Sequence, residues 1–176
     1  MQGEIEMGND CKKPNENRYF CSRKHAAKFN DRLNSRASAA DMIGVSESSL
    51  SDYELGLTKV VPNDKVMLMA ELYGDPELTA WYCKNVCPIG KDYPIATEMT
   101  PIERTTVRLV HDLDVGKVDE VKRTILGIAS DGVIDSTEVA ELDDLMKHLD
   151  SLTEDIWNLR MICKRTKFEL EHKNEI

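Results

Sequence analysis

The stretch AADMIGVSESSLSDYELG, residues 39–56, sets the expectation for the fold. Ser35 is a plausible cap for a short helix that we expect to end at Gly44, because glycine accepts the left-handed conformation in which helices often terminate. Ser46 then suits the N-cap of a further helix over residues 47–55, which ends at the glycine that closes the stretch. The pattern therefore predicts two short helices joined by a turn of only a few residues.

Helical patterns continue on both sides of this pair. The apolar spacing before it predicts a first helix over residues 22–33, and the pattern after it predicts helices that begin at Pro62 and Pro76. The last of these is expected to run to about Val86, before a segment that contains proline and glycine. The first half of the chain is thus expected to hold five short helices.

Residues 100–170 show the same helical periodicity, with little of the alternation that is typical of strands. We expect helices around 106–111 and 115–129, followed by a capping box of Asp135 and Glu138 that begins a third helix. A fourth helix is predicted by a further apolar stripe, formed by Leu152, Ile156, Leu159 and Ile162. The sequence therefore predicts an all-α protein whose second half is an antiparallel helical bundle of two hairpins.

The composition predicts two compact domains and their boundaries. A chain of 176 residues, of which 41% are hydrophobic and 31% are charged, is long enough for two small cores. We expect an N-terminal extension over 1–21, a first domain over 22–88, a proline-containing linker over 89–99, the helical bundle over 100–170 and a tail over 171–176.

The net charge of −9 is unevenly distributed. Residues 1–60 contain nine Lys and Arg against nine Asp and Glu, whereas residues 93–176 contain eleven against eighteen. The acidic second half would repel nucleic acid, but the neutral first half can bind it if its basic residues share a face. Because the sequence has no run of 18 apolar residues and its start lacks the apolar core of a signal peptide, we expect a cytoplasmic protein with no membrane partner.

Residues 39–56 and the helices around them resemble the DNA-binding unit of the phage-repressor (Cro-like, XRE-family) transcription regulators of bacteria. The resemblance covers roughly residues 22–82 and implies a helix-turn-helix domain whose third helix enters the major groove of double-stranded DNA. The matching positions are Ala40 at the family's small residue in the second helix, Gly44 at its turn, Val45 and Leu50 at its core, and Tyr53 to Gly56 at its helix-ending segment.

The resemblance also implies which residues would contact DNA. Arg36 replaces the glutamine that is common in the family, and we expect it to hold a phosphate bidentately. Other phosphate contacts are expected from the basic residues that flank the pair, namely Arg23, Lys24, Lys28, Arg32 and Lys59. The predicted DNA-binding residues are Arg36, Ser46, Glu47, Ser48, Ser49, Asp52 and Lys59. Glu54 is expected to cap or pair internally.

Two classes of function remain open at this point. A sequence-specific transcription regulator is favoured by the basic first helix, whereas the acidic third helix favours a protein-interaction module, similar to an antitoxin or an adaptor, with a repurposed helix-turn-helix. Because one short reading helix gives weak affinity, we also expect a homodimer formed through residues 100–170. Its contact is expected on the apolar stripe of the fourth helix, with Trp157 and Met161 beside it.

The five cysteines, an odd number, fit reduced thiols or a metal site better than a disulfide framework. Cys11, Cys21, Cys83 and Cys87 could converge on zinc or a cluster, but the Cys-x3-Cys spacing is loose and cysteine is commonly buried. We therefore expect packed thiols, with no metal and no cofactor. The four histidines pair with no Ser or Cys nucleophile in a catalytic pattern, so no enzyme is expected.

Overall fold

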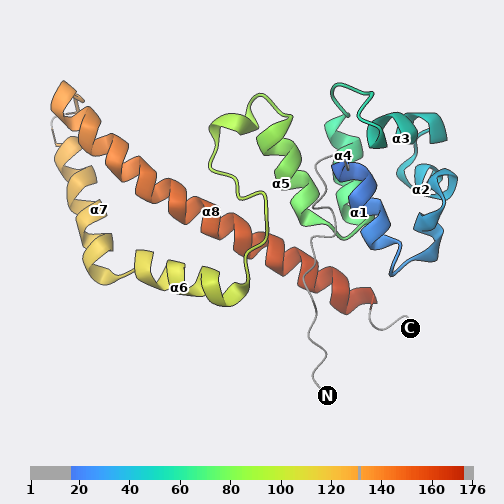
Figure 1. Ribbon diagram of the computed structural model, residues 1–176. Coiled ribbons are helices and arrows are strands. Elements are labelled where there is room, and N and C mark those ends of the chain that lie inside the picture. Colours follow the sequence, from blue (N-terminus) through green and yellow to red (C-terminus); the bar gives the residue numbers. More distant parts are fainter. Residues whose placement is uncertain (1–16, 131, 173–176) are drawn as a thin grey trace, which may run out of the picture. The chain divides into compact units, whose positions relative to one another are not determined.

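The computed structural model describes residues 17–130 and 132–172, and every regular element in these ranges is a helix (Figure 1). The predicted all-α fold class is thereby confirmed. The chain divides into two compact units, Met1–Tyr82 and Cys83–Ile176. Among the helices described, none combines the length and the apolar character needed to cross a bilayer.

The first unit contains helices close to the predicted ones. They are α1 (Arg18–Ala26), a short 3-10 helix η1 (Asp31–Asn34), α2 (Arg36–Ile43), α3 (Glu47–Glu54), α4 (Asn63–Leu72) and α5 (Pro76–Asn85), the last of which runs into the second unit. The prediction of one helix over 22–33 is wrong, because α1 ends at Ala26. The side chain of Asn30 accepts a hydrogen bond from the backbone N–H of Arg32 and so starts a separate turn.

The predicted turn between α2 and α3 is formed by local backbone chemistry. Ser35 caps α2 by accepting a hydrogen bond from the N–H of Ser38, and Ser46 caps α3 by accepting one from the N–H of Ser49. Gly44 ends α2 with a φ of 70°, which is the left-handed conformation that favours glycine. These predictions of the two caps and the turn are confirmed.

The core of the first unit lies between α1, α2, α3 and α4. Ala39 and Ala40 are fully buried on α2, where their short side chains let the neighbouring helices approach closely. The larger side chains that fill the core are Leu33, Leu50, Val61, Val66, Met69 and Leu78. α3 therefore packs against a well-filled core.

The second unit is built from three further helices, α6 (Ile102–Asp112), α7 (Val115–Ile128) and α8 (Ser136–His172), after a short turn of 3-10 helix, η2 (Gly90–Asp92). α6 and α7 follow one another along α8, which runs back past both (Figure 1). The prediction of four helices in two hairpins is wrong, because the third and fourth helices are one helix of 37 residues. Ser136–His172 contains neither glycine nor proline, so nothing interrupts it.

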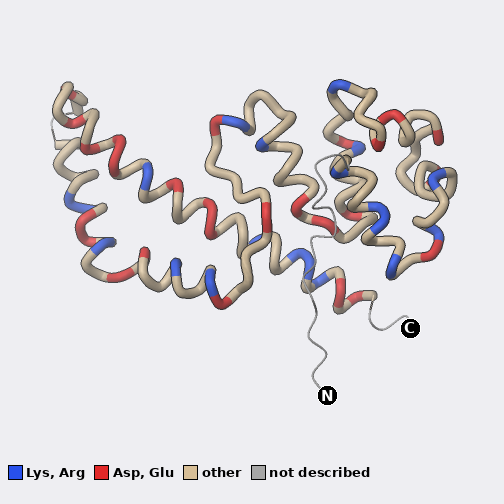
Figure 2. The backbone as a smooth tube through the Cα atoms, in the orientation of Figure 1, with Lys and Arg blue, Asp and Glu red and all other residues tan. Residues whose placement is uncertain are grey.

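The start of α8 confirms the predicted capping box. Oδ1 of Asp135 accepts a hydrogen bond from the N–H of Glu138 at 3.0 Å, and Oε2 of Glu138 accepts one from the N–H of Asp135 at 3.0 Å. Acidic side chains then predominate on α8 up to Asp155, and basic ones gather between Arg160 and Lys167 (Figure 2).

The segment expected as a linker, residues 89–99, lies within the second unit and is held by specific contacts. Lys84 donates hydrogen bonds to the backbone carbonyls of Lys91 and Tyr93, and Gly90 is buried directly against the backbone of Cys83. The segment is therefore packed against the end of α5.

Candidate nucleic-acid interface

α3 turns one face to the core and the other to solvent. Leu50, Tyr53 and Glu54 are buried, whereas Glu47, Ser48 and Asp52 are exposed and Ser49 is half-buried. Ser48 and Asp52 are four residues apart and therefore lie on the same side of the helix. The structure thus brings the predicted base-reading residues together on α3, with two carboxylates among them.

The serine hydroxyls at the start of α3 bond to one another. Oγ of Ser46 accepts the N–H of Ser49 at 3.0 Å and lies 2.9 Å from Oγ of Ser48 and 2.7 Å from Oγ of Ser49. Any contact from these hydroxyls to a base would have to replace or share these bonds.

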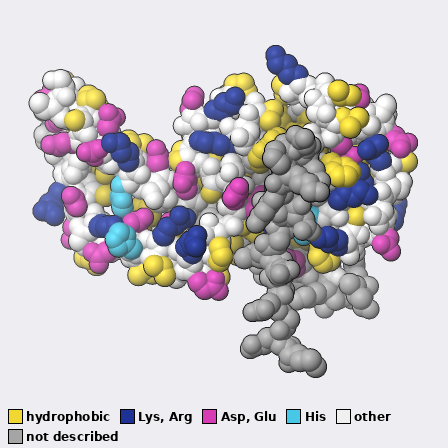
Figure 3. Space-filling view, viewed as in Figure 1, with side chains coloured by type: hydrophobic (Ala, Val, Ile, Leu, Met, Phe, Trp, Pro, Cys, Tyr) yellow, Lys and Arg dark blue, Asp and Glu magenta, His cyan; other side chains and the backbone are white. Residues whose placement is uncertain are grey.

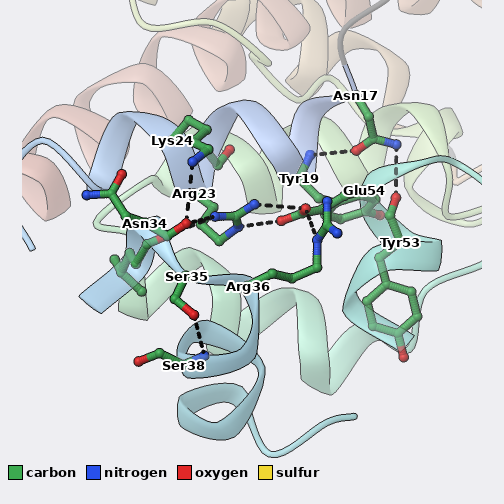
Figure 4. Close-up of polar contacts among 12 residues, drawn as sticks. Asn17, Tyr19, Arg23, Lys24, Asn34, Ser35, Arg36, Ser38, Tyr53 and Glu54 are labelled. Carbon is green, nitrogen blue, oxygen red and sulfur yellow. Dashed lines mark hydrogen bonds and ion pairs between the residues drawn. The ribbon is translucent and has the colours of Figure 1, made fainter. Parts of the chain in front are cut away.

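A buried ion pair joins α3 to α1 (Figure 4). Arg23 and Glu54 have side chains that are only 2% and 1% exposed, and Nη2 of Arg23 donates to Oε2 of Glu54 at 2.9 Å, beside a second bond from Nε to Oε1. Nη1 of Arg23 donates to the carbonyls of Leu33 and Asn34. One side chain therefore links α1, η1 and α3.

This arrangement corrects the expectation for Arg23, which was predicted to contact phosphate. Its guanidinium is buried, so it cannot reach a ligand in solvent. The sequence does carry a signal that was overlooked, because Tyr19, Arg23 and Ala26 follow the three- and four-residue spacing of a buried helix face and all three are buried.

Arg36, the predicted phosphate clamp, is partly committed to the same carboxylate. Its Nε donates to Oε2 of Glu54 at 2.9 Å, and its side chain is 33% exposed. The predicted internal pairing of Glu54 is therefore confirmed, with two arginines as its partners. Burial and then the negative charge of Glu54 raise the pKa of nearby Tyr73, which keeps its phenol neutral.

Other contacts anchor α1 in the same unit. Asn17 accepts the N–H of Tyr19 and donates to the carbonyl of Tyr53, so it caps α1 and holds the end of α3 (Figure 4). The hydroxyl of Ser22 donates to Asp75 at 2.6 Å. The Asn17 bond thus ties α3 to the start of α1, and the Ser22 bond ties α1 to the start of α5.

The remaining predicted phosphate contacts are at the surface. Lys24, Lys28, Arg32 and Lys59 are all exposed, the last on the loop between α3 and α4. The apolar side chains of Leu55, at the end of α3, and of Leu57 and Val60, on this loop, are exposed as well. The surface around α3 therefore combines basic, acidic and apolar groups.

The cysteines do not form a metal site among the residues described. Cys21 is buried and disulfide-bonded, so the expectation of reduced thiols is wrong for this residue. Cys83 and Cys87 are half-buried free thiols, and burial raises the pKa of Cys83, with a smaller contribution from Cys87. Within the described ranges no three His, Cys, Asp or Glu side chains are grouped to bind a metal ion, and Cys11 lies outside them.

No family model matches this chain, and neither the curated proteins nor the solved structures contain a significant match.

Proposed function

We propose that the protein is a sequence-specific, DNA-binding transcription regulator that reads the major groove with α3 as part of a helix-turn-helix. The observation that supports this most is that α3 is held in a fixed position in the first unit. Two eight-residue helices meet at a left-handed glycine, the buried Arg23–Glu54 pair fixes the second of them, and its opposite face is exposed. A short helix held rigidly with polar side chains outward is what groove reading requires.

The chemistry of that face suggests how bases would be read. The carboxylates of Glu47 and Asp52 can accept a hydrogen bond from N4 of cytosine, and the hydroxyl of Ser48 can donate or accept. Phosphates would be contacted by Lys24, Lys28, Arg32 and Lys59, and by the exposed part of Arg36. Because carboxylates repel the DNA backbone, affinity for random sequence would be weak and the correct bases would matter more.

A regulator of this kind would act as a cytoplasmic homodimer on a two-fold DNA site. One module of this size contacts a small area of DNA, so two copies with recognition helices about 34 Å apart would supply the affinity that a single copy lacks. The proposal includes no cofactor and no catalytic step.

The decisive experiment is the salt dependence of DNA binding by the full-length chain. Fluorescence anisotropy with a labelled random duplex between 50 and 200 mM salt should give a steep loss of affinity, with a logarithmic slope of about −0.9 for each phosphate that is neutralised. Lys59→Ala should reduce that slope by about 1. The matched control is Lys147→Ala on α8, which should leave it unchanged. A flat salt dependence would contradict the DNA-binding proposal.

The alternative function, a protein-interaction module, is favoured by one specific observation. Leu55, Leu57 and Val60 are exposed beside the acidic face of α3, while the charge of Arg23 is buried and that of Arg36 is shared with Glu54. An acidic and apolar surface suits a basic, amphipathic partner helix better than it suits phosphate. If this alternative is correct, Leu57→Ser would abolish partner binding and random DNA would not bind.

A further inference from the structure

The helices of the second unit bury few apolar side chains between them. On α6, α7 and α8 the buried apolar residues are Ile128, Leu145 and Met161, within the part of the chain that the structure describes, and the apolar residues beside them, such as Leu109, Val121 and Leu149, are only half-buried. A packed helical core normally buries a continuous apolar stripe from each helix. The contacts of α6 and α7 with α8 therefore bury less apolar surface than the core of a three-helix unit normally does.

The contact between α6 and α8 is largely polar. Thr105, Asp155 and Asn158 are buried there, and Nδ2 of Asn158 donates to Oγ1 of Thr105. Asp155 pairs with Arg108 one turn further along α6. Residue numbers rise along α6 as they fall along α8, so the two helices are antiparallel.

This polar contact leaves the apolar side of α6 in solvent. A helix advances by about 100° per residue, so Val110 and Leu113 lie on one flank of the line through Thr105 that faces α8. On α7, Ile125 and Leu126 lie on the corresponding flank of the line through the buried Ile128. The apolar stripes of the two helices therefore continue one another.

α8 adds apolar side chains to the same side. Met146 directly follows the buried Leu145, and Ile156 directly follows the buried Asp155. Each is therefore rotated by about 100° from the residue that faces the neighbouring helix, in the same sense as the stripes on α6 and α7. In an antiparallel pair, equal rotations from the contact line lead to the same side of the pair. We call this side the open face and define it by Val110, Leu113, Ile125, Leu126, Met146 and Ile156.

The open face is as large as the largest apolar patches that single chains expose. Its six side chains are 45–70% exposed. Together they present on the order of 600 Å² of apolar surface, which already reaches the upper end for the largest patch on a monomer. Ile102, Val107, Val115 and Val139 at its margins extend it toward the roughly 800 Å² per partner of a standard interface. In the view of Figure 3, apolar side chains are visible at the surface along α6.

The charges around this surface suit burial against an identical copy. On α7, Lys122 lies within this face, between Ile125 and Leu126, and already pairs with Asp119 at 3.3 Å. On the other side of α8, the residues that precede the buried Leu145 and Asp155 are the acidic Asp144 and Glu154. The open face thus avoids Asp144 and Glu154, and the charged residues that border it on α8 are Asp143, Asp150 and Arg160.

We propose that the open face is the surface through which two copies of this chain form a dimer. In the dimer, the helices of the two copies would bury the apolar stripes that a single copy leaves in solvent. The inference deepens the homodimer part of the proposed function, but it rests on no contact with DNA. Of the residues predicted to form this contact, Met161 is buried inside the unit, Leu152, Trp157, Leu159 and Ile162 are half-buried, and only Ile156 belongs to the open face.

Sedimentation of the full-length chain without DNA tests the inference. Wild type should be a dimer at tens of micromolar, and Val110→Glu combined with Leu126→Glu should raise the dissociation constant at least tenfold. These two side chains are 68% and 70% exposed, so circular dichroism should show unchanged helix content. The matched control, Arg104→Glu combined with Arg123→Glu, introduces the same residues on the charged side and should leave the dimer intact.

Three outcomes would overturn the inference. They are a wild-type monomer at 100 µM, a Val110→Glu and Leu126→Glu variant that remains dimeric, and loss of helix content in the milder Val110→Ser and Leu126→Ser pair. Because dimers resist unfolding more strongly at higher concentration, the melting temperature of wild type should also rise with concentration. DNA is absent from every measurement, so a failure here is distinct from a failure to bind DNA.

Discussion

Arg23 and Glu54 lie 31 positions apart in the sequence and form a buried ion pair that holds α3 against α1. Two guanidinium nitrogens of Arg23 bind the two carboxylate oxygens of Glu54, and a third donates to backbone carbonyls. Because the exposed face of α3 carries the predicted base-reading residues, this pair determines how that face is presented.

Replacing one partner of the pair should destabilise the protein strongly. Glu54→Gln leaves the buried charge of Arg23 without a counter-charge, which we expect to lower the free energy of unfolding by about 3–5 kcal/mol. Urea denaturation at neutral pH measures this loss. Arg36→Ala removes the partly exposed partner of the same carboxylate and should cost about 1 kcal/mol or less. If Glu54→Gln and Arg36→Ala lowered the free energy of unfolding equally, burial would not determine the strength of the ion pairs of Glu54.

The close approach of Gly90 to α5 predicts a sharp contrast between two glycines. A Cβ atom on Gly90 would lie 2.2 Å from the carbonyl oxygen of Cys83, whereas one on Gly127 would meet nothing within 4 Å. We expect Gly90→Ala to lower the free energy of unfolding by about 1–3 kcal/mol, because backbone must shift. Gly127→Ala should raise it by up to about 1 kcal/mol, because alanine favours the helix. Chemical denaturation of both variants tests the two expectations. If Gly90→Ala left the free energy of unfolding unchanged, the packing of residues 89–99 would be contradicted.

The capping box of α8 predicts a local dependence on pH. Hydrogen bonds from Thr137 and then from the backbone of Glu138 hold the pKa of Asp135 below its usual value. A carboxylate whose pKa is lower in the folded state stabilises the fold above its unfolded pKa, and this stabilisation is lost as the pH falls through the folded pKa. Exchange protection of the Thr137 and Glu138 amides should therefore persist down to about pH 4 and decline below it.

The control for this prediction is Asp135→Asn, because asparagine caps helices nearly as well as aspartate but does not titrate. The variant should retain the cap at neutral pH and lose most of the decline in protection at low pH. If wild type and Asp135→Asn show the same acid profile, the carboxylate of Asp135 is not the titrating group.

The two kinds of predicted DNA contact should respond differently to mutation. Glu47→Ala and Asp52→Ala should change the preferred bases, with about 1–3 kcal/mol of discrimination at each contacted position. Lys59→Ala should weaken binding to all sequences alike, because phosphate contacts carry no base identity. Selection from a random duplex library, followed by affinity measurements, distinguishes the two effects. Unchanged relative affinities in both acidic variants would show that α3 does not read the groove.

The local features of the fold were predictable from short segments of sequence. Ser35, Gly44, Ser46 and Asp135 mark helix boundaries through hydrogen bonds and backbone conformations that involve residues at most a few positions away. The apolar periodicity between them then predicted helices throughout. The same local rule also explains α8, because a segment without glycine or proline has no reason to end near residue 150.

Only the tertiary structure decided which side chains are available for function. The burial of Arg23 depends on Glu54, and the exposure of Val110 depends on the polar contact that Thr105 makes with Asn158 on another helix. A basic residue and an apolar stripe look alike in sequence whether they face the core or solvent. Their orientation is set by partners more than 30 positions away, which no local pattern specifies.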